Sequence, residues 1–323
     1  MDRPRVIVTR RLPAPVEARI AELFDAHLSA DDAPLSAEAL ADAMREADGV
    51  LVTVTDRIDA AVLGAEPRRA GIVANFGAGH DHIDVIAALE RGIVVTNTPG
   101  VLTDDTADLA MALLLAVMRR VGEGERHVRS GAWSGWRPTH MLGARVTGAT
   151  LGIVGMGRIG RAVAARAFNG FGMRITFHQP STVGTANLAG LDAARCDTIE
   201  ELLATSDAVS LHCPSTPATR HLIDARRLAL MRPGAVLINT ARGDIVDEAA
   251  LASALAAGTI AGAGLDVYAD EPHVTPELLA LENVVLLPHL GSATREARLA
   301  MGHRAVDNLL AFFAGRDAPD RVA

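Results

Sequence analysis

Leu151-Gly-Ile-Val-Gly-Met-Gly-Arg-Ile-Gly160 is the stretch that decides the fold, because an apolar, strand-like run precedes its glycines and a helical pattern follows them. The glycines have the spacing G-x-G-x-x-G. Gly155 permits a tight turn, Gly157 lets a pyrophosphate approach the backbone, and Gly160 lets the helix pack closely on the strand. Phosphates would lie at the positive end of that helix. In this strand–turn–helix context the motif predicts a dinucleotide-binding unit.

Apolar runs alternate with helical patterns on both sides of this motif. Runs of Val, Ile and Leu without polar alternation are typical of strands covered on both faces, and strands separated by helices indicate parallel sheets. The predicted strands are 6–8, 50–54, 72–76, 93–96, 150–154, 174–177, 208–212, 235–239, 263–267 and 284–287. The sequence therefore predicts an α/β protein, and its 323 residues suggest two domains.

The first domain boundary is expected at Thr98-Pro99-Gly100. Residues 1–99 would form one domain and residues 100–292 the dinucleotide-binding domain. An acidic segment, 103–108, leads into an apolar helix at 109–118, which we interpret as a connector between domains. A final helix follows the last predicted strand, so residues 293–323 are expected to return to the first domain and make it discontinuous.

Composition excludes several classes of protein. The net charge of −8 argues against nucleic acid, whose binding needs clustered Lys and Arg. Two cysteines, Cys196 and Cys213, are too few for a disulfide framework. The charged N-terminus lacks a signal-peptide core, and the longest apolar run, 109–118, is about half of what spans a bilayer. We therefore expect a cytoplasmic protein with no membrane partner, and we identify no candidate metal site.

The residue that would contact the ribose indicates which cofactor is used. An acid about 20 positions after the glycine motif normally binds the ribose 2′-hydroxyl. Here Gln179 occupies that place, beside His178, and no carboxylate is present to repel a 2′-phosphate. His178, Gln179, Ser181 and Thr182 could donate hydrogen bonds to such a phosphate, although the loop contains no arginine. The sequence favours NADPH and leaves use of both NADH and NADPH open.

Three late strands end in side chains that can perform acid–base chemistry. Arg242, Glu271 and His289 each follow a predicted strand, at the sheet edge where α/β proteins bind ligands. Histidine can give a proton to a carbonyl oxygen as a hydride arrives, and a carboxylate can orient its ring. Arginine binds a substrate carboxylate with two parallel hydrogen bonds. Together they predict hydride transfer to a small 2-oxo acid; taken singly, Glu271 could be a loop acid and Arg242 a surface ion pair.

Six segments of the chain resemble D-isomer-specific 2-hydroxyacid dehydrogenases, most of all the glyoxylate/hydroxypyruvate reductase branch. They are 75–84, 95–108, the glycine motif, 239–243, 270–272 and 288–292. The resemblance spans essentially the whole chain. It implies two Rossmann-like or flavodoxin-like domains with parallel sheets and an active-site cleft between them. It also implies that Arg242, Glu271 and His289 are the catalytic set and that the product is the D-2-hydroxy acid.

The resemblance also implies a set of binding residues. Arg158 and Ile159 would lie on the pyrophosphate, Thr240 and Asp266 at the nicotinamide end, and the loop 213–219 over the adenosine. The implied cofactor-binding residues are Gly155, Gly157, Arg158, Ile159, Gly160, Gln179, Cys213, Thr219, Thr240, Ala241, Asp266 and Gly291. The implied substrate-binding residues are Phe76, Gly77, Ala78, Gly79, Arg242 and Trp136.

The same resemblance implies a homodimer, paired through the region after the connector helix. Trp136 matches a tryptophan that can reach the partner's active site. An alternative role, packing in the core of the dimer interface, is equally consistent with the sequence. Two departures from the family pattern stand out: Gln179 replaces an acid, and Ala78 replaces a hydroxyl found in some relatives. Glu271 argues against a formate dehydrogenase. Two alternatives stay open, a nucleotide-sensing protein of the corepressor type and a dehydrogenase of another small anion such as phosphite.

Overall fold

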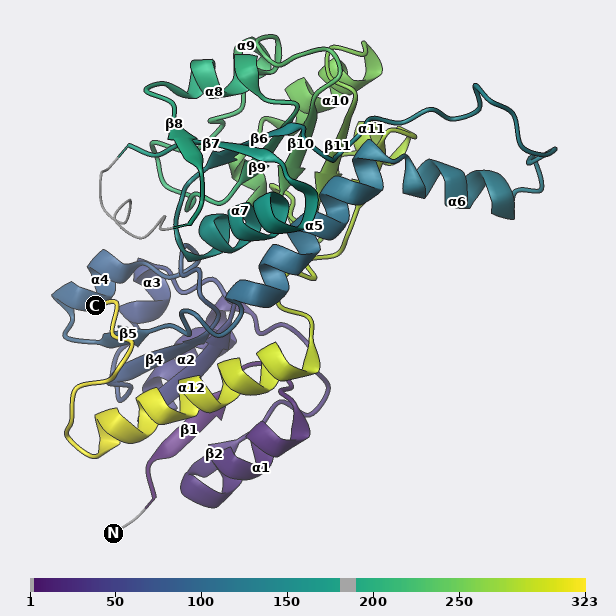
Figure 1. The fold of residues 1–323 in the computed structure, drawn as a ribbon. Coiled ribbons are helices and arrows are strands. Elements are labelled where there is room, and N and C mark those ends of the chain that lie inside the picture. Colours follow the sequence, from purple (N-terminus) through teal and green to yellow (C-terminus); the bar gives the residue numbers. More distant parts are fainter. Residues whose placement is uncertain (1–2, 181–189) are drawn as a thin grey trace. The chain divides into compact units, whose positions relative to one another are not determined.

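The computed structural model describes residues 3–180 and 190–323. The chain divides into a first unit, Met1–Leu102 with Ala293–Ala323, and a second unit, Thr103–Ser292. Each unit has one sheet (Figure 1), and the paired strands of both sheets are parallel throughout the described residues. The predicted α/β class with two parallel sheets is confirmed. The break between the units lies between Leu102 and Thr103, and the buried apolar residues of the helix that starts at Thr103 belong to a core of the second unit.

The first unit is a five-stranded sheet in the order β2-β1-β3-β4-β5. Its strands are β1 Arg5–Val8, β2 Asp25–His27, β3 Gly49–Thr53, β4 Ile72–Phe76 and β5 Val94–Thr96. Its helices are α1 Ala14–Leu23, α2 Ala37–Glu46, α3 Ala60–Leu63, α4 Val85–Glu90 and α12 Arg295–Phe313. The sequence did not predict β2, an edge strand of three residues that contains no apolar run.

Helix α12 belongs to the first unit, although it follows the last strand of the second unit along the chain. A Cβ atom at Gly302 would lie 2.4 Å from Val16 of α1, so only glycine lets the two helices approach this closely. A Cβ atom at Gly49 of β3 would lie 3.1 Å from Phe313. Figure 1 shows α12 (yellow) lying across the strands of this sheet. Beyond α12, the backbone N–H of Val322 donates to Val95 of β5.

The second unit is a seven-stranded sheet in the order β12-β11-β10-β9-β6-β7-β8. Its strands are β6 Thr150–Val154, β7 Arg174–His178, β8 Ala193–Arg195, β9 Ala208–Leu211, β10 Val236–Asn239, β11 Gly262–Leu265 and β12 Val284–Leu286. The chain runs outward from β6 to β7 and β8, then returns to β9 on the other side of β6. Ligands of such sheets bind beyond the carboxyl ends of the strands at this reversal. The sequence did not predict β8.

Helices cover both faces of this second sheet. They are α5 Thr103–Met118, α6 Val121–Arg129, α7 Arg158–Phe171, α8 Ile199–Thr205, α9 Ala225–Leu228, η2 Gly243–Ile245, α10 Glu248–Ala256 and α11 Pro276–Leu279. The apolar run of α5 is buried against the sheet, since a Cβ atom at Gly264 of β11 would lie 3.0 Å from Leu113. Within the described ranges, none of the helices combines the length and the apolarity needed to cross a membrane.

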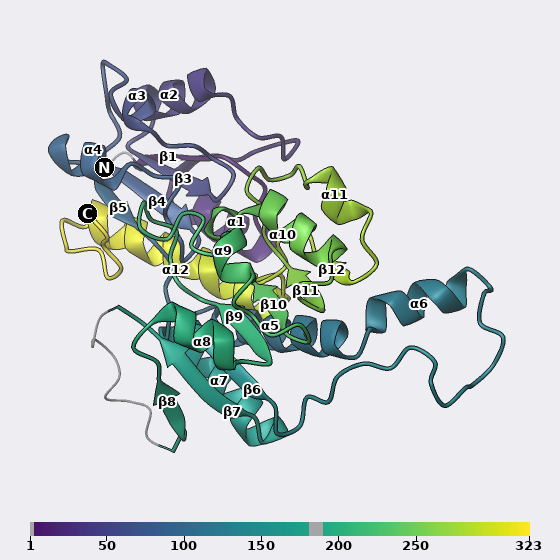
Figure 2. The ribbon, with the colours of Figure 1, turned by 90° about the horizontal axis from the view of Figure 1, so that it is seen from above.

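Helix α6 differs from the other long helices because none of its residues is buried. The segment that follows it, 130–145, is mostly exposed. In both views α6 and this segment project from the sheet of their own unit as an open loop (Figure 2). Its exposed apolar side chains include Trp133, Trp136 and Leu142. Trp136 is 82% exposed, so it forms no part of the core of this chain.

Candidate active site

The glycine motif forms a turn that can hold a pyrophosphate. Gly155 has φ +94°, and a Cβ atom there would lie 2.8 Å from the backbone N of Cys213. A Cβ atom at Gly160 would lie 2.2 Å from the carbonyl oxygen of Gly155, so the helix approaches the turn as the spacing predicts. Nothing lies within 4 Å of a Cβ atom at Gly157. The backbone there is open on its outer side, which fits the close approach of a phosphate.

Helix α7 begins at the turn without a capping side chain. Gly157 is its N-cap residue and makes no side-chain cap hydrogen bond. Arg158 and Ile159 are its first two residues, and the first amides of a helix have no partner within the helix. These amides and the helix dipole favour an anion at this end. The residues present therefore fit the diphosphate of a dinucleotide.

Gln179 lies against the glycine turn. The backbone N–H of Met156 donates to Gln179 Oε1 over 3.1 Å, and that of Gly155 donates to the carbonyl of His178 over 3.0 Å. These two hydrogen bonds join the end of β7 to the turn. Gln179 occupies the position where a ribose-binding acid is usual. Ser181 and Thr182, the other donors predicted for a 2′-phosphate, lie outside the described residues.

His212 is a partly buried histidine on the other side of the same turn. It follows β9, and its Nε2 lies 2.8 Å from Ser210 Oγ. Burial lowers the pKa of His212 to about 4, because a charged imidazole loses its hydration inside the protein. His212 is therefore neutral at pH 7.

The lowered pKa of His212 predicts a pH dependence of stability. Its pKa is about 4 in the folded chain and 6.5 ordinarily, so the unfolded chain binds more protons between these values. Stability should therefore fall as pH drops through this window, by up to about 3 kcal/mol. Chemical denaturation at several pH values, with His212→Asn beside the wild type, checks this expectation. An equally steep fall in His212→Asn would contradict it.

His289 and Glu271 form a hydrogen-bonded pair. His289 Nδ1 lies 2.8 Å from Glu271 Oε2, and the two side chains are 30% and 35% exposed. A second oxygen, Glu271 Oε1, accepts the backbone N–H of Tyr268 over 3.1 Å. The carboxylate is thus fixed at both oxygens, and the ring is held through Nδ1. Among the described residues no hydrogen-bond partner is seen for His289 Nε2, so this nitrogen can face a substrate.

The charge state of Glu271 follows from its neighbours. Burial raises the pKa of the Glu271 carboxyl, and the hydrogen bond and positive charge of His289 lower it. The Tyr268 amide and the charge of Arg242 lower it further, and the net pKa of Glu271 is below its ordinary value. Glu271 is therefore ionised at neutral pH and can stabilise a protonated imidazole.

Arg242 is brought to this pair by the turn after β10. The side chain of Asn239 shapes the turn: it donates to the Arg242 carbonyl over 2.8 Å and accepts the Ala241 N–H over 3.0 Å. A Cβ atom at Gly243 would lie 1.9 Å from the carbonyl carbon of Tyr268. Only glycine fits, so the chain beside Arg242 lies against the segment that carries Glu271. The structure brings Arg242, Glu271 and His289 into one neighbourhood of the second unit.

The backbone at His289 is held in a conformation unusual for a non-glycine residue, with φ +54°. Asp266 supplies the restraint. Its carboxylate accepts the N–H groups of Leu290 over 2.7 Å and Gly291 over 2.8 Å, and its carbonyl accepts the His289 N–H over 2.9 Å. From the other side, the Thr106 hydroxyl donates to the Gly291 carbonyl over 2.9 Å. The direction of the imidazole therefore depends on Asp266.

Asp266 is 1% exposed, and burial raises its pKa above the ordinary value. The amides of Leu290 and Gly291 and the charge of His289 oppose this rise. The sequence predicted Asp266 at the nicotinamide end. It did not predict the hydrogen bonds of Asp266 to residues 289–291, nor the roles of Asn239 and Gly243. The nearby Thr240 Oγ1 is buried and has no hydrogen-bond partner among the described residues. An unpartnered buried hydroxyl beside this turn fits a polar ligand.

The predicted substrate loop, 76–79, lies in the first unit, after β4. Asn75 Nδ2 donates to the carbonyls of Gly77 over 3.1 Å and Gly79 over 2.8 Å, and Asn97 Nδ2 donates to that of Ala78 over 2.7 Å. Two amide side chains thus set the shape of this loop. The guanidinium of Arg298 lies 6.0 Å from the centre of the Phe76 ring.

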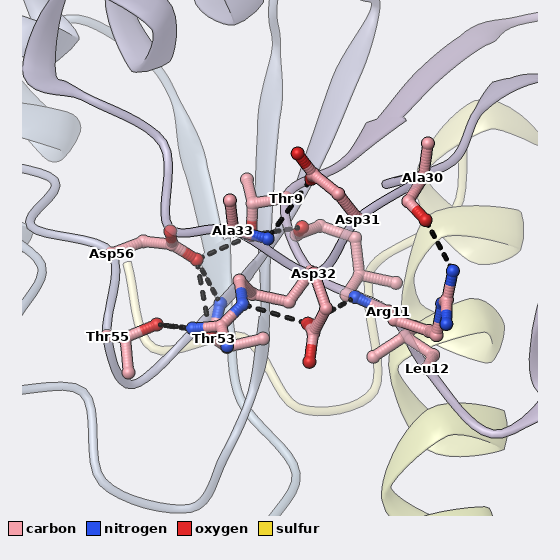
Figure 3. Close-up of polar contacts among 12 residues, drawn as sticks. Thr9, Arg11, Leu12, Ala30, Asp31, Asp32, Ala33, Thr53, Thr55 and Asp56 are labelled. Carbon is pink, nitrogen blue, oxygen red and sulfur yellow. Dashed lines mark hydrogen bonds and ion pairs between the residues drawn. The ribbon is translucent and has the colours of Figure 1, made fainter.

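A second loop, 53–56, lies against the first. Val54 Cγ1 is 3.2 Å from a Cβ atom placed at Gly77. The loop is fixed by Asp56, which is 1% exposed and accepts the backbone N–H of Thr53 over 2.7 Å together with the hydroxyl of Thr9 (Figure 3). Asp56 thus ties the ends of β1 and β3 beside the predicted substrate loop.

Known proteins are similar to this chain in sequence and in fold. Residues 111–291 match the family model described as D-isomer specific 2-hydroxyacid dehydrogenase, NAD binding domain. A glyoxylate reductase of Thermococcus litoralis is 46% identical over 99% of this chain and 97% of its own. The TT0316 protein of Thermus thermophilus has a solved structure with TM-score 0.89 and 46% identity, covering 99% of this chain and 100% of that one.

A further solved structure carries a bound nucleotide. It is the NADPH-dependent glyoxylate/hydroxypyruvate reductase of Sinorhizobium meliloti in complex with NADP and malonate, with TM-score 0.88 and 39% identity, covering 100% of this chain and 97% of that one. These similarities extend over the whole chain and include both units. The chain therefore belongs to the D-isomer-specific 2-hydroxyacid dehydrogenase family and is an NAD(P)-dependent oxidoreductase.

Proposed function

We propose that the protein reduces glyoxylate or hydroxypyruvate to the corresponding D-2-hydroxy acid, with a preference for NADPH. The observation that carries the proposal is the 2.8 Å contact between His289 Nδ1 and ionised Glu271, with Arg242 close enough to lower the pKa of Glu271. All three follow strands of the sheet whose glycine turn fits a dinucleotide. Relatives over the full chain length are named glyoxylate reductases.

The proposed reaction divides the work among three side chains. The hydride would come from a bound reduced nicotinamide, which would be oxidised as a C–H bond forms at the carbonyl carbon and the C=O double bond becomes single. His289 gives the proton on Nε2 to the carbonyl oxygen, which leaves a neutral imidazole. Glu271 holds Nδ1–H throughout and stabilises the protonated ring before transfer. Arg242 binds the substrate carboxylate through two parallel hydrogen bonds and draws electron density from the ketone.

Two observations support the preference for NADPH. The ribose-binding position holds Gln179 in place of a carboxylate, which would repel a 2′-phosphate. The Sinorhizobium meliloti relative is described as NADPH-dependent. The roles of the other cofactor residues, and of 76–79 and Trp136 in substrate binding, stay predictions.

A substrate panel tests the proposed function. Initial rates with glyoxylate, hydroxypyruvate, pyruvate and phosphite, each with the appropriate form of NAD and NADP, should show the highest kcat/KM for glyoxylate or hydroxypyruvate with NADPH. Hydroxypyruvate should yield the D isomer. Robust phosphite oxidation without 2-oxo acid reduction would overturn the assignment, and nucleotide binding without turnover of any substrate would favour a nucleotide-sensing protein.

We also propose that the protein is a homodimer formed through α6 and the segment 130–145. Helix α6 has no buried residue, and Trp133 and Trp136 are 55% and 82% exposed. Aromatic side chains are enriched at protein interfaces, and a second copy would remove these from water. Sedimentation equilibrium should give the mass of a dimer. Trp136→Ser should weaken the association, and a wild-type monomer at all concentrations would contradict the proposal.

A further inference from the structure

Strand β8 brings an arginine to the end of β7. The two strands are parallel, with Phe177 opposite Arg195. From there the Arg195 side chain reaches across, and its Nη2 donates to the carbonyl of Gln179 over 3.1 Å. Gln179 is the residue at the ribose-binding position. Sequence reasoning missed this contact, because 16 residues separate the two and β8 was not predicted.

The contact between Arg195 and Gln179 lies next to backbone that is held by hydrogen bonds between β7 and β8. The backbone N–H of Cys196 donates to the carbonyl of Phe177 over 2.8 Å, and His178 Nδ1 lies 3.2 Å from the carbonyl of Cys196. Cys196 itself is buried. The residue after Arg195 is therefore anchored, so the base of the Arg195 side chain has a defined place at the carboxyl edge of the sheet.

The guanidinium keeps the capacity to bind an anion. Arg195 is an exposed residue, and among the described residues no carboxylate forms an ion pair with it. Its hydrogen bond to Gln179 uses one of about five N–H donors. A phosphate monoester carries a charge of about −1.5 to −2 at pH 7, and an arginine can bind two of its oxygens at once. A ribose 2′-hydroxyl offers no such charge.

We propose that Arg195 is the residue that selects NADPH over NADH, by binding the 2′-phosphate of the adenosine ribose. The inference rests on the proposed dinucleotide binding. Arg195 on an edge strand then supplies the positive charge that the loop after β7 lacks. Gln179 contributes by its position: its carbonyl orients the guanidinium, and its side chain leaves no negative charge at the site.

Direct binding measurements on the full chain test this inference without turnover. Dissociation constants for NADPH, NADH, adenosine 2′,5′-bisphosphate and 5′-AMP are compared for the wild type, Arg195→Ala and Arg195→Lys by calorimetry. Arg195→Ala should weaken NADPH and the bisphosphate by about 10- to 100-fold, the range for losing hydrogen bonds to a charged group, and leave NADH and 5′-AMP unchanged. Arg195→Lys should retain part of the affinity. The control is Arg316→Ala, at an exposed arginine of the first unit after α12, which should alter no constant.

The outcomes separate the two proposals. If the wild type binds both nucleotides but Arg195→Ala leaves the NADPH constant unchanged, or weakens NADPH and NADH equally, Arg195 does not select the cofactor and the proposed function stands. If the wild type binds neither nucleotide, the proposed function fails and this inference fails with it. A selective loss restricted to ligands that carry the 2′-phosphate supports the inference.

Discussion

His289→Ala should lower kcat for 2-oxo acid reduction by about 10²- to 10⁴-fold, the usual contribution of a positioned acid or base. The substitution removes the only proposed proton donor, which Glu271 holds at 2.8 Å. The dinucleotide should still bind, because the glycine turn is formed by β6, α7 and β9 and does not include His289. Steady-state kinetics together with nucleotide titration check both parts.

The matched control for this variant is His27→Ala, at an exposed histidine of β2 in the first unit. It removes an imidazole of equal size and should leave kcat unchanged. Near-normal kcat in His289→Ala would mean that another group protonates the substrate. Loss of nucleotide binding together with kcat would mean that the substitution disturbs the hold of Asp266 on residues 289–291.

Arg242→Ala should lower kcat/KM for glyoxylate by about 10²- to 10³-fold, because two charge-assisted hydrogen bonds to the substrate carboxylate are lost. Arg242→Lys keeps the positive charge but cannot form the planar pair of hydrogen bonds. It should therefore raise KM more than it lowers kcat. Kinetics over a range of glyoxylate concentrations separate these two effects.

One result would contradict the prediction for Arg242. If Arg242→Lys retained the wild-type KM, the arginine would not hold the carboxylate. Its remaining role would be its charge beside Glu271, which contributes to the lowered pKa of that carboxyl. A substrate analogue without a carboxylate distinguishes the roles, since its turnover should change little in Arg242→Lys only if Arg242 acts on the carboxylate.

Much of the fold could be predicted from sequence because its central strands are continuous apolar runs. The strands β2 and β8 were missed for the same reason: Asp25–His27 and Ala193–Arg195 are short edge strands with no such run. Edge strands pair on one side only, so their side chains need not be apolar. Missing β8 also hid the contact of Arg195 with Gln179.

The candidate site shows a similar limit. Strand ends place Arg242, Glu271 and His289 at one edge of a parallel sheet, which sequence can predict. The close approach of Gly243 to Tyr268 and the hold of Asp266 on the backbone after His289 depend on how neighbouring turns meet in space. No spacing within one segment reveals such contacts, because each joins residues from different strands.

The proposed chemistry depends above all on His289, fixed by Glu271, as the proton donor to a 2-oxo acid that a nicotinamide nucleotide reduces. The most direct test follows nucleotide absorbance while glyoxylate and NADPH are mixed with the wild type or with His289→Ala already shown to bind NADPH. We predict rapid oxidation of NADPH by the wild type and almost none by the variant. Equal rates in the two proteins, or no oxidation by the wild type, would contradict this role of His289.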